Sequence, residues 1–384
     1  MPLDRVLARL RQRITPTRRA AFLACFIAGY LIHLFAFTNI IPNSDGLSRV
    51  FDPQQMTVSG RWFLHYASFL NDFTQMPALI GFFSMVFLAL AAAGVVTALN
   101  LHSRALSAFA GVLMAAFPCL GYTFLYMFTA SAYCLAILLA VLAVCLVKKG
   151  GWLRTLAGVV LLALAMGIYQ AYAAVAVALS LLVVLRACLH SRSTLKGTAR
   201  LGLRLAGFLA VGAALYYGIL QIFLAVKDLE LLDYLGMSDA GSGYPVAQLP
   251  GLILSAYKQV FVFFFWPNGS NSFTTPLLAG LDLLALALAV ACFLAIVFRR
   301  ALWREPWRLI GALVLAALLP LAVGFAQIIA PFSDATPIMK YAYVLVYMAV
   351  LLAADLGLSF LPRPRGGMAV SGVLALCLAG VTLY

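Results

Sequence analysis

The stretch LRTLAGVVLLALAMGIYQAYAAVAVALSLLVVLRAC, residues 153–188, decides how this chain folds. It is apolar almost throughout, and as one continuous helix it would be about 54 Å long. The hydrocarbon core of a bilayer is only about 30 Å thick, so a single crossing cannot use the whole stretch. We therefore predict that it breaks near Gly167–Gln170 and forms two membrane helices.

Apolar runs of similar length recur along the chain, which is 65% hydrophobic. Runs long enough to cross the hydrocarbon predict an all-α, polytopic membrane protein with about eleven transmembrane helices. The odd number and the absence of an internal sequence period argue against a secondary transporter built from two equal repeats. The predicted helices span 20–41, 77–99, 105–121, 129–147, the two halves of 153–188, 204–226, 277–298, 308–329, 338–360 and 367–384.

The basic residues indicate how these helices are oriented. When the loops are taken alternately as inside and outside, only five of the 26 Lys and Arg residues fall outside. Cytoplasmic loops carry such an excess of Lys and Arg, so we predict an N-terminus inside and a C-terminus outside. The net charge of +14 then reflects topology and contact with anionic lipid, and we do not expect nucleic-acid binding. The five basic residues predicted outside are Arg49, Arg61, Lys227, Lys258 and Lys340.

The chain divides into a short tail and one transmembrane domain. Residues 1–19 form a basic, amphipathic segment predicted to be cytosolic. The apolar run that follows is too long for the core of a signal peptide, so 20–384 is predicted to be a single transmembrane domain. Its two long outer loops cover 42–76 and 227–276. Within the second loop, Leu249–Trp266 is predicted to be a helix lying in the outer interface.

The cysteines and histidines do not point to a metal or a cofactor. All seven cysteines lie within or at the ends of apolar runs, and the four histidines are far apart. Neither spacing matches a metal site or a disulfide framework. The outer carboxylates are scattered as well, so we expect no metal site and no cofactor.

The first outer loop is the polar segment richest in groups that could act in catalysis. Asp45 comes just after the first helix, beside a glycine that permits a tight turn. Arg49 and Arg61 follow, and two such cations can hold phosphate through charge-assisted hydrogen bonds. A carboxylate base with cations for a phosphate leaving group suits glycosyl transfer from a lipid-phosphate sugar. The alternative is that these are ordinary solvated loop charges.

Five further residues stand out within or beside apolar runs. Tyr169 and Gln170 lie at the predicted helix break, where polar groups line a wet cavity or, alternatively, bond between packed helices. Lys340 departs from the charge pattern and either holds a lipid phosphate or snorkels to the interface. Asp282 and Asp355 lie in apolar runs close to helix ends, which favours an interfacial placement.

These segments resemble the serotype-converting O-antigen glucosyltransferases. The resemblance rests on Asp45 and Arg49 after the first helix, on Gly60-Arg61-Trp62, and on Gly167-Ile168-Tyr169-Gln170-Ala171 at the break. It implies a multi-pass protein of the GT-C class that takes a sugar, usually glucose, from an undecaprenyl-phosphate carrier. The reaction is then expected on the outer face of the bacterial inner membrane, with an acidic residue of the first outer loop as base.

The chain departs from that family in one respect. Many members carry two adjacent acidic residues in the first outer loop, whereas here Asn43 and Ser44 precede the single Asp45. Asp52 and Asp72 are the candidates for the second carboxylate.

The expected function is therefore transfer of a hexose, with glucose as the family's usual sugar, from a polyprenyl-phosphate carrier. The acceptor is a glycan or a lipid-linked saccharide, and membrane lipid surrounds the site. Asp45 is the expected base, and the expected donor-binding residues are Arg49, Arg61, Tyr169, Gln170 and Lys340. The main alternative is a transporter or flippase of lipid-linked sugars, and a structural subunit is a third. The helix middles consist mostly of Leu, Ala and Val, which favours the enzyme because transport needs polar groups through the full membrane depth.

Overall fold

The computed structural model describes residues 14–41, 43, 45, 56–69, 76–190, 193–231, 248–267, 274–329, 336–357, 360 and 380. Within these residues every regular element is a helix, and one isolated β-bridge joins Met56 to Arg61. The predicted all-α fold is confirmed. The elements are α2 (Pro16–Ile32), α3 (Leu34–Thr38), η1 (Thr57–Ser59), α5 (Leu64–Ala67), α6 (Pro77–Leu99), α7 (Arg104–Ala116), α8 (Pro118–Leu125), α9 (Met127–Lys149), α10 (Trp152–Ile168), η2 (Gln170–Tyr172), α11 (Ala173–Leu189), α12 (Leu195–Lys227), α13 (Leu249–Phe265), α14 (Pro276–Arg299), η5 (Leu302–Arg304), α15 (Pro306–Val323), α16 (Phe325–Ile329), η6 (Pro337–Tyr343) and α17 (Val344–Gly357).

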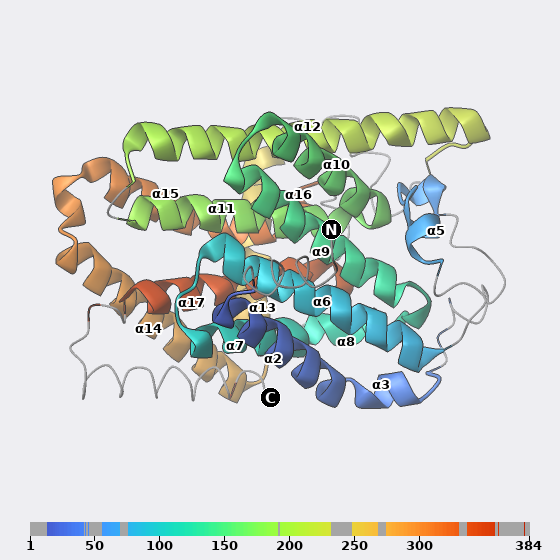
Figure 1. Ribbon diagram of the computed structural model, residues 1–384, viewed down its shortest axis with the longest axis horizontal. Coiled ribbons are helices and arrows are strands. Elements are labelled where there is room, and N and C mark those ends of the chain that lie inside the picture. Colours follow the sequence, from blue (N-terminus) through green and yellow to red (C-terminus); the bar gives the residue numbers. More distant parts are fainter. Residues whose placement is uncertain are drawn as a thin grey trace, which may run out of the picture.

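The long helices lie side by side, and α12 runs along one edge and projects beyond the others (Figure 1). Burial separates central from peripheral helices. In α9 and in the segment Gln170–Leu189, 78% of the residues in the apolar stretch are buried. The corresponding share is 22% in α12 and 28% in α14 and α15. The exposed faces of the peripheral helices are largely Leu, Val and Ile, which suits contact with lipid.

Seven helices in the described part of the chain are long and apolar enough to cross a membrane, or eight if α7 and α8 form one bent span. Helices α2, α10 and α13 are 17 residues each and fall just short of that length. The span predicted at 367–384 lies outside the described residues. The chain is thus a polytopic helical protein, and the total of eleven spans stays a prediction.

Local sequence explains where several helices begin, bend and end. The predicted helix 77–99 coincides with α6, and the predicted break at Gly167–Gln170 separates α10 from α11. The predicted helix 105–121 is instead bent by 42° between α7 and α8, because Pro118 cannot donate a backbone hydrogen bond and holds Phe117 out of helical geometry. Helix α12 begins earlier than the predicted residue 204, since the Thr194 hydroxyl caps it by accepting from the Gly197 N–H at 3.1 Å.

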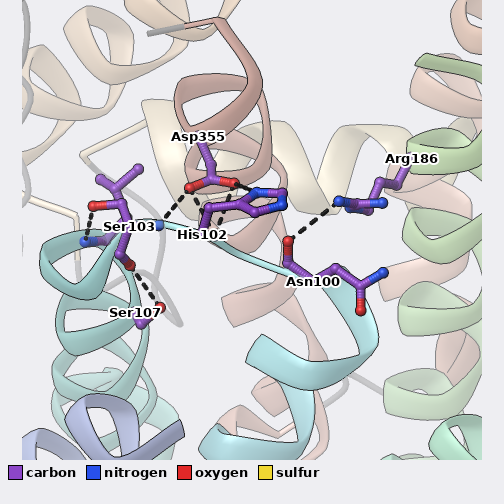
Figure 2. Close-up of polar contacts among 7 residues, drawn as sticks. Asn100, His102, Ser103, Ser107, Arg186 and Asp355 are labelled. Carbon is purple, nitrogen blue, oxygen red and sulfur yellow. Dashed lines mark hydrogen bonds and ion pairs between the residues drawn. The ribbon is translucent and has the colours of Figure 1, made fainter. Parts of the chain in front are cut away.

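The turn between α6 and α7 is held by charged side chains from distant helices. Asp355 of α17 accepts hydrogen bonds from the backbone N–H groups of His102, at 3.0 and 3.1 Å, and Ser103, at 2.9 Å (Figure 2). Its Oδ2 also lies 3.0 Å from His102 Nδ1. A carboxylate at this point satisfies donors beside the start of α7, where the helix dipole favours negative charge.

Two cations complete this arrangement on the other side of the turn. Lys148 Nζ of α9 donates to the Ala98 carbonyl at 2.7 Å and to Asn100 Oδ1 at 3.1 Å. Arg186 of α11 donates to the Asn100 carbonyl at 3.2 Å (Figure 2). Both bond the carbonyl end of α6, which carries the negative end of the helix dipole. We call the set the turn clasp: Asn100, His102, Ser103, Lys148, Arg186 and Asp355.

The other carboxylate within an apolar run is also buried against protein. Asp282 of α14 is 5% exposed and accepts a hydrogen bond from the Tyr347 hydroxyl of α17 at 2.8 Å. Asp355 is 8% exposed. Both carboxylates tie α17 to neighbouring segments, and their interfacial placement stays a prediction.

Candidate functional site

The helix break at the end of α10 creates the candidate site. Helix α10 ends at Ile168, Tyr169 is extended at φ −157° and ψ 113°, and the 3-10 turn η2 leads into α11. Such a break leaves the last carbonyl groups of α10 without helical partners. In this chain, groups from the segment 56–69, which belongs to the predicted first outer loop, meet them.

The motif Gly60-Arg61-Trp62 docks directly onto the break. The Phe63 N–H donates to the Gly167 carbonyl at 2.8 Å, and Gln170 Nε2 donates to the Ser59 carbonyl at 2.8 Å. Gly167 is required for this approach, because a Cβ there would lie 2.7 Å from the Trp62 ring. Two of the three segments that carried the family resemblance, Gly60-Arg61-Trp62 and the break at 167–171, are thus packed against each other.

A tyrosine that the sequence analysis did not single out completes the docking. The Tyr216 hydroxyl of α12 donates to the Gly60 carbonyl at 3.0 Å and accepts from Gln170 Nε2 at 3.0 Å. Tyr216 is 7% exposed, and Gly60 adopts a left-handed backbone with φ +78°. The only local signal was a pair of tyrosines, Tyr216-Tyr217, inside an apolar helix.

Docking fixes the position of the Arg61 guanidinium. Arg61 Nη1 donates to the Tyr133 hydroxyl at 3.2 Å, and Cζ lies 4.6 Å from the centroid of the Tyr169 ring. The two tyrosine rings stack on each other at 4.9 Å. Cation–π contact of this kind orients an arginine and stabilises its position. We call this set the break node: Ser59, Gly60, Arg61, Tyr133, Tyr169, Gln170 and Tyr216.

The element that carries Lys340 packs against the same break. Lys340 lies on η6, is 8% exposed, and is within electrostatic range of Cys119. Turn η6 contacts η2, and the Tyr172 and Tyr341 rings meet edge to face at 6.4 Å. Two regions far apart in sequence, one with Arg61 and one with Lys340, therefore meet the same short turn.

Of the acidic candidates, Asp45 lies within the described residues. Asp45 is exposed, and its N–H donates to Asn43 Oδ1 at 2.9 Å. Arg49, Asp52 and Asp72 lie outside the described residues. Among the residues that are described, no three His, Cys, Asp or Glu side chains are grouped so that they could hold a metal ion.

An open cavity of about 370 Å³ lies at the C-terminal end of α12. Its walls include Gln221, Asp228 and Glu230, and no residue of the break node lines it. Helix α12 also meets the docked segment beside this cavity, since Phe223 stacks on Trp62 at 5.7 Å.

Fold and site together define a polytopic helical membrane protein in which a loop carrying Arg61 is docked on a broken helix, beside the turn η6 that carries Lys340. The model of the glucosyl transferase GtrII family matches residues 34–353, which is most of the chain. The chain belongs to this family, so the predicted resemblance is confirmed and the protein is a membrane glycosyltransferase. No curated protein and no solved structure matches it.

Proposed function

We propose that this glycosyltransferase moves a hexose, glucose by analogy with its family, from a polyprenyl-phosphate carrier to a glycan or lipid-linked saccharide. The observation that carries the proposal is the convergence at the helix break, where Arg61 lies over Tyr169 and the Lys340-bearing turn η6 contacts η2. Two cations held by separate elements suit a phosphate leaving group, because opposite charge must be in place before the sugar–phosphate bond breaks.

The proposed reaction is a displacement at the anomeric carbon. The acceptor hydroxyl oxygen attacks C1 of the sugar, and the C1–O bond breaks with its electron pair leaving on the phosphate oxygen. Asp45 takes the proton of the attacking hydroxyl. Arg49, Arg61 and Lys340 stabilise the negative charge that develops on the phosphate.

Tyr169 and Gln170 support this site from the broken helix. The Tyr169 ring lies under the Arg61 guanidinium, and Gln170 Nε2 bonds Ser59 and Tyr216. We therefore propose that Tyr169 and Gln170 form a wall of the donor site. The bonds of Gln170 fit this role better than direct recognition of phosphate.

We further propose a GT-C-type arrangement in the bacterial inner membrane, with the reaction on the periplasmic face. The tail 1–19 is then cytoplasmic, and the loops 42–76 and 227–276 are periplasmic. Short helices occur in both loops, η1 and α5 in the first and α13 in the second. Cysteine-accessibility labelling should place residues 45 and 239 outside and residue 196 inside. Finding residues 45 and 196 on one side would end this orientation and the site with it.

The decisive experiment replaces Asp45. Loss of a positioned base costs about 10²–10⁴ in rate, so Asp45→Asn should abolish most sugar transfer while donor binding survives. Asp52→Asn and Asp72→Asn are the matched controls and should lose much less. If Asp52→Asn or Asp72→Asn is inactive while Asp45→Asn works, the base is another carboxylate. If all three variants transfer sugar normally, none of these carboxylates is the base, and the catalytic site proposed at this loop is refuted.

A further inference from the structure

The docked segment depends on one hydroxyl that joins three elements. Tyr216 Oη of α12 donates to the Gly60 carbonyl and accepts from Gln170 Nε2 of η2, both at 3.0 Å. Gln170 Nε2 also donates to the neighbouring Ser59 carbonyl at 2.8 Å. Two successive peptide carbonyls are therefore held by a pair of neutral side chains that also bond each other.

This arrangement sits immediately before Arg61 in the chain. Since Gly60 and Arg61 share a peptide unit, any movement of the Gly60 carbonyl moves the start of the arginine side chain. The guanidinium must meet both the Tyr133 hydroxyl at 3.2 Å and the Tyr169 ring at 4.6 Å, so it tolerates little displacement.

We propose that Tyr216 and Gln170 are positioning residues, which hold the Ser59 and Gly60 carbonyls so that Arg61 lies over Tyr169. The inference rests on the proposed role of Arg61 in binding the donor phosphate. Tyr216 touches no reacting atom in this scheme and affects sugar transfer through Arg61. Hydrogen-bond networks of this kind are coupled, because removing the Tyr216 hydroxyl leaves the buried Gly60 carbonyl without this partner.

The chain supplies a matched control beside Tyr216. Tyr217 follows it on α12, points about 100° away around the helix, and is 51% exposed. Tyr216→Phe removes the hydroxyl from the node, whereas Tyr217→Phe makes the same chemical change at an exposed ring. A misplacement of about 1 Å at a site can cost about 10²-fold in rate, so we expect Tyr216→Phe to lose about 10- to 100-fold in transfer. Tyr217→Phe should transfer sugar at the wild-type rate.

A double mutant separates positioning from general stability. If Tyr216 acts through Arg61, adding Tyr216→Phe to Arg61→Gln should cost no further activity, because the guanidinium it positions is already gone. Independent effects would instead multiply. Multiplicative losses, or equal losses in Tyr216→Phe and Tyr217→Phe, would overturn the proposal.

A labelling experiment tests docking without any sugar donor. Thr57 of η1 is 3% exposed, and all six native cysteines in the described residues are buried. The test protein is a Thr57→Cys variant that still transfers sugar, and an impermeant maleimide should react with it slowly. If Tyr216→Phe loosens the docked segment, adding it should speed this reaction at least about tenfold. An unchanged labelling rate refutes the positioning role whatever the transfer assay gives. If labelling becomes faster but the wild-type protein uses no polyprenyl-phosphate sugar as donor, the docking is supported and the proposed function is refuted.

A second variant covers the case in which Tyr216→Phe does not accumulate in the membrane. Gln170→Glu keeps the side-chain shape but sets an oxygen where the donor Nε2 faces the Ser59 carbonyl. It should speed labelling and lower transfer as Tyr216→Phe does. Wild-type labelling and transfer in Gln170→Glu would overturn the proposal.

Discussion

The break node and the turn clasp lie at opposite ends of α9 and of the segment Gln170–Leu189. They satisfy backbone groups with different kinds of side chain. Helix α9 carries Tyr133 to the node and Lys148 to the clasp, about 22 Å apart along the helix axis. In the clasp, charged side chains bond the backbone directly: Lys148 donates to carbonyls and Asp355 accepts from N–H groups. At the node, the neutral side chains of Gln170 and Tyr216 do this, and the Arg61 guanidinium is held by tyrosines instead.

This difference indicates what each region contributes. The charges of the clasp satisfy helix ends, so their loss should lower the free energy of unfolding. At the node, neutral side chains bond the backbone carbonyls, and the Arg61 cation lies beside tyrosine rings. Loss of the node should therefore lower the rate of sugar transfer more than the free energy of unfolding. Each of the following predictions tests that division, from the largest expected effect to the smallest.

Among the variants that compare node and clasp, the largest effect is expected for Arg61→Gln at the node. Loss of a cation at the leaving phosphate should lower transfer about 10²-fold, which corresponds to about 2.7 kcal/mol in activation free energy. The unfolding temperature in detergent should change little. Lys227→Gln is the control, since Lys227 also lies over an aromatic ring, Phe223, at 5.7 Å but outside the node. Equal losses in both variants would contradict a specific role for Arg61.

Asp355→Ala should have the next largest effect, on stability. It removes the acceptor of two backbone N–H groups beside α7. We expect a loss of about 2 kcal/mol in the free energy of unfolding, measured by denaturant titration in detergent. Transfer per folded molecule should stay within about twofold of wild type, a change of under about 0.5 kcal/mol. The free energy of unfolding of Asp355→Asn, which keeps one accepting oxygen, should lie between that of Asp355→Ala and that of the wild type. A variant that is stable yet inactive would place the clasp in the reaction instead.

Gly167→Ala tests the packing of the node. The added methyl would lie 2.7 Å from Trp62 and must displace the docked segment. Overpacking costs about 1–3 kcal/mol, and displacement of Arg61 should lower transfer about tenfold. Gly207→Ala on α12 is the control, because a Cβ there meets nothing within 4 Å. Normal transfer by Gly167→Ala would show that the docking tolerates a shift at Trp62.

The smallest effect is expected for Glu305→Gln, near the turn between α11 and α12. Glu305 pairs with Arg308 at 2.8 Å, but its carboxylate is half exposed, and Arg308 also bonds the His190 and Ser193 carbonyls. An exposed partner of this kind contributes about 0–1 kcal/mol. Both unfolding and transfer should match wild type within error. A loss comparable to that of Asp355→Ala would mean that charge alone, rather than backbone capping, stabilises these turns.

The sequence by itself determined the helical course of the chain. The apolar run that became α6 was predicted to the residue, and the break at Gly167–Gln170 followed from length alone. These features could be predicted because bilayer thickness and solvation act on each segment locally. The family could be predicted as well, since its motifs are short and contiguous.

Only the tertiary structure decided that the two motifs belong to one site. Gln170 and Ser59 are 111 positions apart, and Tyr216 and Gly60 are 156 apart. No local pattern assigns Tyr133 or Tyr216 to the node. The sequence of an apolar helix with a tyrosine is the same whether the hydroxyl bonds lipid headgroups or a group from another segment. Which side chain reaches which carbonyl depends on how the helices pack and in what register, and packing is a property of the whole bundle.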